Sequence, residues 1–475
     1  MYGITVTGFK KTVWRKMCRQ QCERHFNAGG IWAAWCERCR QDDAHADDMR
    51  CFEIDFGQYP PEWKDGGTVR YEFLKILRKK STLIVRAVSL ILTGFLFGLP
   101  MMQYQIYNQD GVIKKGAKGI AYEKEQFADL SVPLSEEYVA ETIREVQGLF
   151  ENPDNIGTDG NEQFLVGDAY WNGVAPREKL LNLIADTYSS PNDSWGYNHL
   201  SELDVKEGKP FYQAIKGKIQ ALLDSPSRAL SDEQKEYWDG MADKVDTPLR
   251  YGYHRGWEII ISSFELLMFA LLAICIVIAP VFSGEYQAGT DAVILSAKYG
   301  KTKLMTAKIA ASLLFGTAAF ILHVVVACGL LLAAFGTDGW NLPLQIANTT
   351  IPYPYTFLQA ALTGIGVIYL ILLAMIGVTL LLSAKMKGPY AVLIILVPIL
   401  FIPMFLTPNG TTGVYNLLLF LLPYRSTMPE FGKYISYQFG GMVLDALTVR
   451  AVLYAVLTAT MLPLARSGFR KHQVA

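Results

Sequence analysis

Long apolar runs separated by polar segments dominate the second half of this 475-residue chain. A helix needs roughly 20 mainly apolar residues to cross the hydrocarbon core of a bilayer. Six runs meet or approach that length, at residues 82–104, 257–282, 309–335, 357–382, 389–406 and 449–465. The pattern predicts an all-α membrane protein with six transmembrane helices.

The segments between these runs predict how the chain is divided. Residues 69–104 combine a basic helix with the first span, residues 105–255 form a large polar insertion, and residues 256–475 carry spans two to six. The apolar run at 414–423 is too short to cross a bilayer, so we expect a re-entrant or interfacial segment there. A polar loop at 284–308 separates the second span from the third.

The net charge of zero conceals a separation of charge along the chain. Residues 105–255 hold 26 Asp and Glu against 16 Lys and Arg, although the whole chain has 44 of each kind. Clusters of Lys and Arg beside spans stay on the cytoplasmic side of a membrane. The clusters are Arg78, Lys79 and Lys80; Lys298, Lys301, Lys303 and Lys308; Lys385 and Lys387; and Arg466, Arg470 and Lys471. With six spans in the cell membrane, every cluster and both termini are cytoplasmic, and the insertion lies outside.

The insertion shows the periodicity of amphipathic helices. Val139, Ile143 and Val146 recur at helical spacing, and Ser231 with Gln234 fits a capping box that opens a further helix. No nucleophile elbow, zinc-protease helix or paired-carboxylate site stands out in its sequence. We therefore expect a mostly helical extracytoplasmic domain that forms a substrate vestibule, a docking surface or a structural cap.

Cysteines cluster in the N-terminal segment 1–68. Cys18 with Cys22, and Cys36 with Cys39, form short pairs of the kind that hold structural zinc. The surrounding sequence lacks the strand and Gly-turn pattern of a zinc ribbon, so reduced cytoplasmic thiols are favoured over a metal site. A competing hypothesis is that translation starts at Val69, so that residues 1–68 are an artefact of gene annotation.

The loop at 284–308 contains a recognisable order of residues. Glu285 is followed by Gly289 and Thr290, then by the stretch AVILSAKYGKTK, and Lys308 leads into the third span. This order resembles the segment between the second and third spans of type-two ATP-binding-cassette (ABC) exporter permeases. The order of spans over residues 69–475 is similar to theirs as well. Where relatives often carry Pro and Arg after the Leu-Ser pair, the basic role here would pass to Lys298 and Lys301.

The resemblance implies the permease subunit of an ABC exporter, working as a homodimer or heterodimer in membrane lipid. The loop would contact a separate ATPase subunit, which binds ATP and Mg, and would move when that subunit closes. A short helix with Ala292, Val293, Ile294 and Leu295 could place apolar side chains in a groove of that partner. The chain itself is expected to bind no cofactor and no nucleic acid, and peptides, drugs, lipids and glycans all remain compatible as substrates.

Two alternatives stay open for this loop and for the complex. The complex could transmit force or a signal to an extracytoplasmic partner without moving a substrate. Alternatively, the loop could be a solvated positive segment whose lysines serve only to orient the spans.

The tripeptide Gly300–Lys301–Thr302 resembles the end of a phosphate-binding P-loop. That motif requires Gly five residues before the Gly-Lys pair, and the residue there is Leu295. The chain is therefore not expected to hydrolyse ATP or to be an enzyme in its own right.

Polar residues within the predicted spans are further candidates, because ionisable groups in a bilayer usually face a bundle interior or water. Glu258 and Glu265 lie seven residues apart on one predicted helix face, and the deeper Glu265 is a candidate for lining a transport pathway. His323 in the third span is expected to form a hydrogen bond between helices. Asp445 and Arg450, at the start of the last span, are expected to pair with each other.

Overall fold

The computed structural model describes residues 66–471, apart from residues 129, 161, 192, 204–208 and 298. In this part of the chain, which is mostly helical, five helices are long and apolar enough to cross a membrane. They are α4 (Lys80–Gln103), the run Phe264–Ala288 that ends with α12 (Leu267–Ile278) and α13 (Pro280–Ala288), α15 (Lys303–Phe335), α16 (Phe357–Lys385) and α20 (Ala446–Arg470). The chain is thus a predominantly helical protein with the features of a membrane protein.

The apolar run predicted as the fifth span forms a shorter helix. It comprises α17 (Pro389–Phe401) and the 3-10 turn η9 (Ile402–Phe405), with Pro398 inside α17. At about 1.5 Å per residue, its length is about 25 Å, less than the roughly 30 Å of a hydrocarbon core. The described chain therefore has five helices of spanning length and one shorter apolar helix.

The predicted helix over residues 257–282 is interrupted. Helix α11 (Arg255–Ser262) ends at Ser263, and the 3-10 turn η7 (Phe264–Leu266) leads into α12. Glu258 and Glu265 therefore lie on separate elements rather than on one face of a continuous helix. Hydropathy could not reveal this break, because all the residues around it are compatible with a helix.

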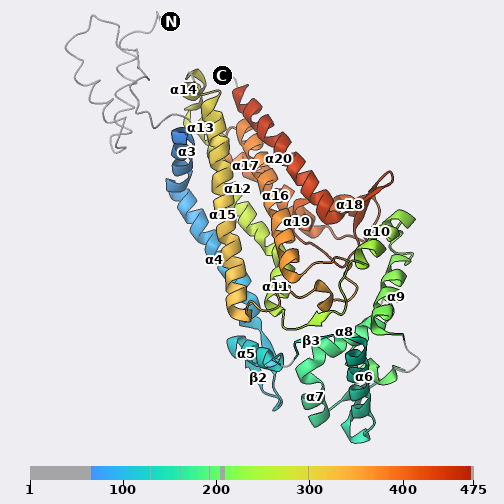
Figure 1. The fold of residues 1–475 in the computed structure, drawn as a ribbon. Helices are drawn as coiled ribbons and strands as arrows, with labels where there is room; N and C mark the ends of the chain where they lie inside the picture. The colour runs from blue at the N-terminus through green and yellow to red at the C-terminus, as the bar shows by residue number, and fades with distance from the viewer. Residues whose placement is uncertain are drawn as a thin grey trace, which may run out of the picture. The chain divides into compact units, whose positions relative to one another are not determined.

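Helix α16 occupies the middle of the bundle. Helices α12, α15 and α20 pack against it, and α4 packs against α12 and α15 (Figure 1). Small residues permit close approach between helices that have no hydrophobic driving force in lipid. At Gly364 of α16, an added Cβ would lie 2.4 Å from the Phe264 ring, so the absence of a side chain lets the second span approach α16.

The residues between α4 and α11 fold into short helices and hairpins. The helices are α5 (Gly116–Gln126), α6 (Glu136–Phe150), η4 (Pro153–Asn155), α7 (Gly167–Gly173), η5 (Ala175–Arg177), α8 (Glu178–Tyr188), η6 (Tyr197–Glu202), α9 (Phe211–Leu223) and α10 (Asp232–Ala242). Val139, Ile143 and Val146 are buried, as their spacing predicted. The capping box of Ser231 and Gln234 forms at the start of α10.

Four antiparallel strand pairs occur among the described residues. They are β1 (Gln105–Tyr107) with β2 (Ile113–Lys115), β3 (Val132–Pro133) with β6 (Arg250–Tyr251), β4 (Ile156–Asp159) with β5 (Glu162–Leu165), and β7 (Ser436–Phe439) with β8 (Met442–Asp445). The β3–β6 pair places Val132 opposite Tyr251. It therefore brings together two points of the chain that flank most of the short helices.

Helix α10 is fixed to the loop before α20. The Trp238 indole is fully buried and donates to Ser436 Oγ at 3.2 Å. Its ring makes edge contacts with Tyr353 and Tyr434, each with ring centroids 5.5 Å apart. These contacts attach the short helices to the loops that lead into α16 and α20.

The polar residues at the start of α20 do not form the expected pair. Asp445 caps α20 by accepting from Leu447 N, and it also accepts from the Tyr353 hydroxyl. Arg450 is fully buried and donates to the carbonyls of Phe420 and Met428, in the region of α18 (Val414–Leu419) and α19 (Pro423–Ser426). The counter-charge of Arg450 is therefore not Asp445 but Glu430, whose Oε2 lies 3.6 Å from Arg450 Nη2. The carbonyl of Phe420 belongs to the predicted re-entrant segment.

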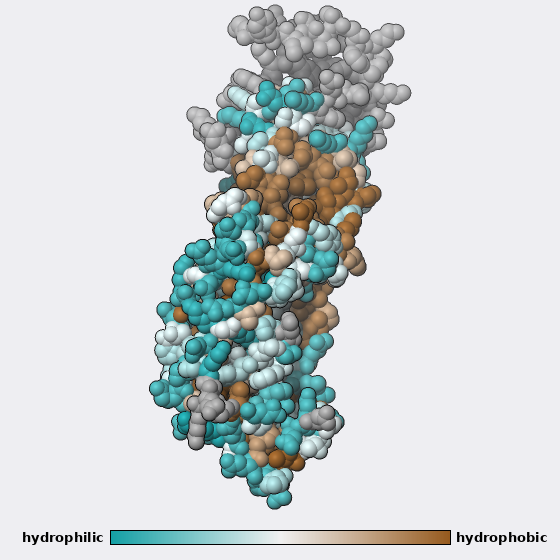
Figure 2. Space-filling model, turned by 90° about the vertical axis from the view of Figure 1, so that its right-hand side faces the viewer, coloured by the Kyte–Doolittle hydropathy of each residue, from teal (hydrophilic) through white to brown (hydrophobic). Residues whose placement is uncertain are grey.

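The surface of the molecule has an apolar zone between two polar ends, as expected of a protein with membrane-spanning helices. Figure 2 shows hydrophobic residues gathered in a band on the visible face, with hydrophilic surface beyond it on either side. Exposed apolar side chains on α4 and α15 include Ile84, Ile91, Leu314 and Val325. Such a surface is compatible with lipid tails or a second membrane protein as its neighbour.

We predict that Gly364→Ala lowers the stability of the protein by about 1–3 kcal/mol, because the new methyl group collides with the Phe264 ring. The matched control is Gly366→Ala on the same helix, where an added Cβ meets nothing within 4 Å. Melting temperatures of the two purified proteins in detergent measure the effect. Equal melting temperatures for the two variants would refute the tight contact at Gly364.

Candidate functional site

The loop between α13 and α15 has a defined backbone. Helix α13 ends at Gly289, whose φ of +65° is the left-handed conformation that favours glycine at a helix end. Thr290 N then donates to Glu285 O at 3.0 Å. The short helix α14 (Asp291–Ser296) follows, and α15 begins at Lys303 after a turn. The Gly-Thr pair thus closes α13 and redirects the chain.

A cluster of charged side chains fastens this loop to the rest of the bundle. Lys308 Nζ lies 3.1 Å from Glu72 Oε2 and 2.8 Å from Glu285 Oε1. Lys75 Nζ lies 2.7 Å from the same oxygen of Glu285. We call these four residues the charge cluster. It joins α3 (Gly66–Arg78), the end of α13 and the first turns of α15.

The interior of the charge cluster is largely removed from solvent. Lys308 is 2% exposed and Glu72 is 5% exposed. A buried charge without partners is strongly unfavourable, whereas two lysines facing two glutamates balance to zero. We therefore infer that the cluster mainly determines how α3, α13 and α15 pack together. Its net contribution to the free energy of unfolding is expected to be small.

The outer members of the cluster are more accessible. The side chain of Lys75 is half exposed. Burial lowers the pKa of Lys75, but its hydrogen bond and charge attraction to Glu285 outweigh burial, so its pKa lies above the ordinary value. Thr290 Oγ1 donates to the other carboxylate oxygen, Glu285 Oε2. Glu285 is thus the residue on which Lys75, Thr290 and Lys308 converge.

A second set of contacts fixes α13 to α16. Ser383 Oγ accepts from Phe282 N at 3.0 Å and Ser283 N at 2.9 Å, and it donates to Ala279 O at 2.6 Å. The Tyr286 hydroxyl donates to Ala384 O at 2.8 Å. The helix that carries Glu285 is therefore held from both sides, by the charge cluster and by the end of α16.

Helix α14 presents a small apolar surface beyond the charge cluster. Val293 is 71% exposed and Ala292 is also exposed, whereas Leu295 is buried against the rest of the chain. The sequence predicts Ala292, Val293, Ile294 and Leu295 as a partner-binding face. Leu295 instead packs inside this chain, so it is not available to a partner. Figure 1 shows α14 at one end of the bundle and the short helices α5 to α8 at the opposite end.

The predicted site residues fall into distinct groups. Thr290 and Lys308 meet at the Glu285 carboxylate, and Gly289 is the residue at which α13 ends beside them. Lys301 is exposed in the turn before α15, and Lys298 lies outside the described residues. The proposed cysteine ligands, Cys18, Cys22, Cys36 and Cys39, also lie outside the part of the chain that the structure describes. Within that part, no group of three His, Cys, Asp or Glu side chains could hold a metal ion.

Glu265 lies apart from the charge cluster. Its Oε2 accepts from the Tyr424 hydroxyl of α19 at 3.1 Å. His323 forms the expected bond between helices, with Nε2 lying 3.1 Å from Ser89 Oγ of α4. These two contacts connect spans without forming a shared site.

Sequence reasoning missed Glu72 and Lys75. A signal was present, since Glu72 is the one acidic residue between Gly66 and Lys80, and Lys75 follows it at the i, i+3 spacing that places both on one helix face. An acid alone within a strongly basic helix is a candidate for an internal partner. What the sequence could not supply was the partner itself, because Lys308 lies far along the chain.

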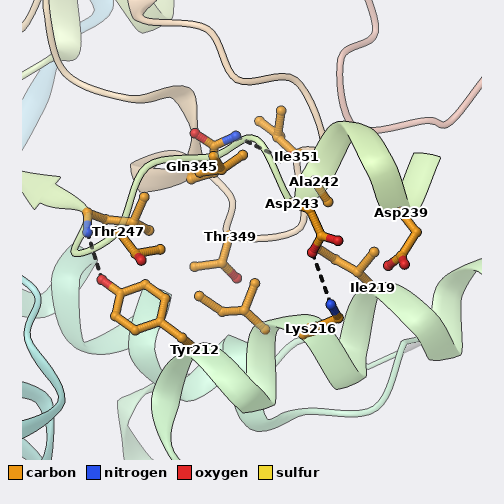
Figure 3. Close-up of a pocket in the computed structure, with 13 residues that line it drawn as sticks. Tyr212, Lys216, Ile219, Asp239, Ala242, Asp243, Thr247, Gln345, Thr349 and Ile351 are labelled. Atoms are coloured by element: carbon orange, nitrogen blue, oxygen red, sulfur yellow. Dashed lines mark hydrogen bonds and ion pairs between the residues drawn. The ribbon is translucent and has the colours of Figure 1, made fainter. Parts of the chain in front are cut away.

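A pocket lies at the other end of the molecule, where α9 and α10 meet the loop before α16. Its volume is about 230 Å³ (Figure 3). Lys216 and Asp243 pair with each other at 3.0 Å. The Gln345 side chain donates from Nε2 to the carbonyls of Ile351 and Tyr353, both at 2.8 Å. These contacts hold the loop in place, so the pocket is a junction between the short helices and the spans.

Comparisons with known proteins gave no match to a protein family, to a curated protein or to a solved structure.

We predict that Lys308→Met destabilises the protein by about 3 kcal/mol, because it leaves the carboxylates of Glu72 and Glu285 in a buried site with too few cations. Lys301→Met, in the exposed turn nearby, should leave the melting temperature unchanged. Adding Glu72→Gln to Lys308→Met should restore at least half of the loss, because Lys75 and Glu285 then form a neutral pair. No recovery in the double variant would contradict the proposed charge balance.

Proposed function

We propose that this chain is the membrane-spanning permease subunit of an ABC exporter. In this proposal it is embedded in the cell membrane with both termini in the cytoplasm and works as a homodimer or heterodimer. Residues 284–308 receive the movement of a separate ATPase subunit that binds ATP and Mg. The segment between α4 and α11 lies outside the cell.

The observation that carries the proposal is the way in which the α14 loop is anchored. The loop projects at one end of the bundle and exposes Val293, while the charge cluster ties its base to α3 and α15. Ser383 ties the same base to α16. A plain loop that only orients the spans has no need of such anchoring, which supports a mechanical role.

The anchoring also supports a mechanism. A partner that pushes on α14 would displace α13 and α15 directly, because both connections are short. Gly289 and Thr290 join α13 to α14, and the turn before Lys303 joins α14 to α15. Since α13 is fixed to α16 and α15 is fixed to α3, the displacement passes to several helices together instead of bending one. In this proposal, ATP-driven closure of the partner tilts these helices and alternates access to a pathway, for which Glu265 is the candidate lining residue.

A second candidate function is transmission of force or a signal to an extracytoplasmic partner without transport. It is favoured by the attachment of α10, whose Trp238 is buried against Tyr353 and Tyr434 and bonded to Ser436. Movements of α16 and α20 would pass through these loops to the short helices. The hydrogen bond of Glu265 to Tyr424 also leaves that carboxylate engaged within the chain.

We predict that Val293→Asp weakens binding of the ATPase subunit on the order of tenfold, because it places a charge in the apolar contact. The chain would be co-expressed with an ABC ATPase from a neighbouring gene, as the proposal expects, and the amount of ATPase that co-purifies would be measured. The control is Val112→Asp, which alters an exposed valine near the β1–β2 hairpin at the other end of the molecule.

Two outcomes would overturn the proposal. One is that no ATPase co-purifies with the unaltered chain. The other is that Val293→Asp retains as much ATPase as Val112→Asp. To separate export from force transmission, Glu265→Gln should lower export of substrate in reconstituted vesicles but leave ATPase binding intact; unchanged export would favour the second function.

A further inference from the structure

A groove with basic side chains runs between α3, the first turns of α15 and the last turns of α20. Two adjoining pockets, with volumes of about 460 and 260 Å³, share Thr306 and Arg466 and together form it. Figure 1 shows that these three helix ends lie at the same end of the bundle as α14. We call this feature the basic groove. It is distinct from the charge cluster, since none of the four cluster residues lines it.

The charged residues that line the basic groove are all cations. They are Lys303, Arg466 and Arg470. The hydroxyls of Thr302 and Ser467 lie among them and can donate to an anion, whereas the Thr306 hydroxyl donates to Thr302 O at 3.2 Å. Such a combination of guanidinium, ammonium and hydroxyl donors is suited to a phosphate group, because its oxygens accept several charge-assisted hydrogen bonds at once.

Within the part of the chain that the structure describes, the two arginines of the basic groove, Arg466 and Arg470, form no ion pair, and both are exposed. Lys308 and Lys75, close by, are fully paired with glutamates. Like charges that share a groove repel one another, so an external anion would lower the energy of this arrangement.

The groove becomes apolar as it passes from the helix ends toward the bundle. Ile309 lies further into α15 than Lys303, and Leu462 and Pro463 lie further into α20 than Arg466. Cations at the helix ends with an aliphatic wall beyond them match a phospholipid, whose phosphate lies at the membrane surface and whose acyl chains enter the hydrocarbon. An inorganic anion would make no use of the apolar wall.

We propose that the basic groove binds one anionic phospholipid, with its phosphate held by Arg466 and Arg470 and an acyl chain along Ile309 and Leu462. Basic pockets between membrane helices are suited to anionic headgroups. The inference rests on the chain spanning a membrane and not on its having an ATPase partner. In the topology proposed above, the lipid belongs to the cytoplasmic leaflet.

Binding there would have a structural consequence. The lipid bridges α20 to α3 and α15, and the last turn of α20 places Phe469 against Phe282 and Tyr286 of α13. Occupancy of the groove would therefore brace the helix ends around the α14 loop.

The test uses the full chain purified in detergent and its melting temperature during titration with phosphatidylglycerol. We expect the melting temperature to rise with phosphatidylglycerol but not with phosphatidylcholine of the same acyl chains or with inorganic phosphate. Arg466→Gln and Arg470→Gln should each weaken the apparent affinity on the order of fivefold, the change that corresponds to about 1 kcal/mol for one basic residue near a membrane surface. Native mass spectrometry of bound lipid gives a second readout that does not depend on unfolding.

The matched control is Lys385→Gln with Lys387→Gln, which removes two cations beside the end of α16 but outside the groove. It should keep the response of the unaltered chain. The proposal is overturned if the arginine variants respond like the unaltered chain, or if the lysine control loses as much affinity, which would indicate a diffuse attraction. It is also overturned if inorganic phosphate stabilises the protein as well as phosphatidylglycerol does.

Discussion

The positive charge of Lys308 determines how α3, α13 and α15 pack at one end of this protein. An ammonium group with almost no access to solvent must be neutralised within the fold. The two carboxylates that neutralise it come from α3 and α13, so both helices must be in place beside α15. Shifting one of these helices by a turn would move its partner about 5.4 Å away. The ion pairs therefore define the register of three helices that apolar packing alone would allow to slide.

Three kinds of contact hold the helices together at this end of the molecule. Charge attraction joins α3, α13 and α15, hydrogen bonds of Ser383 join α13 to α16, and aromatic contacts of Phe469 join α13 to α20. Each requires a particular geometry, unlike the aliphatic contacts deeper in the bundle. The base of the α14 loop is consequently held by α3, α15, α16 and α20 together.

Features that are determined by residues close together in the sequence were predicted correctly. Features that depend on tertiary packing were missed. The apolar runs follow from the thickness of the bilayer, and the capping box at Ser231 follows from residues three positions apart. Glu285 and Lys308 were found through the order of residues in their loop. The contact of Lys308 with Glu72 was missed because it requires α3 and α15, which are far apart in the sequence, to pack together. The break at Ser263 and the short helix α17 were missed because hydropathy does not report backbone geometry.

The antiparallel pairing of β3 with β6 has an evolutionary consequence. Because Val132 lies opposite Tyr251, the chain leaves and rejoins the region near the spans through adjacent strands. The helices between β3 and β6 therefore begin and end at this strand pair. Helices α6 and α7 can therefore change in length with little effect on the spacing of α4 and α11, whereas α10 is fixed by Trp238 to the residues before α16 and α20. The part of this region farthest from α16 is consequently the part with most freedom to vary in size.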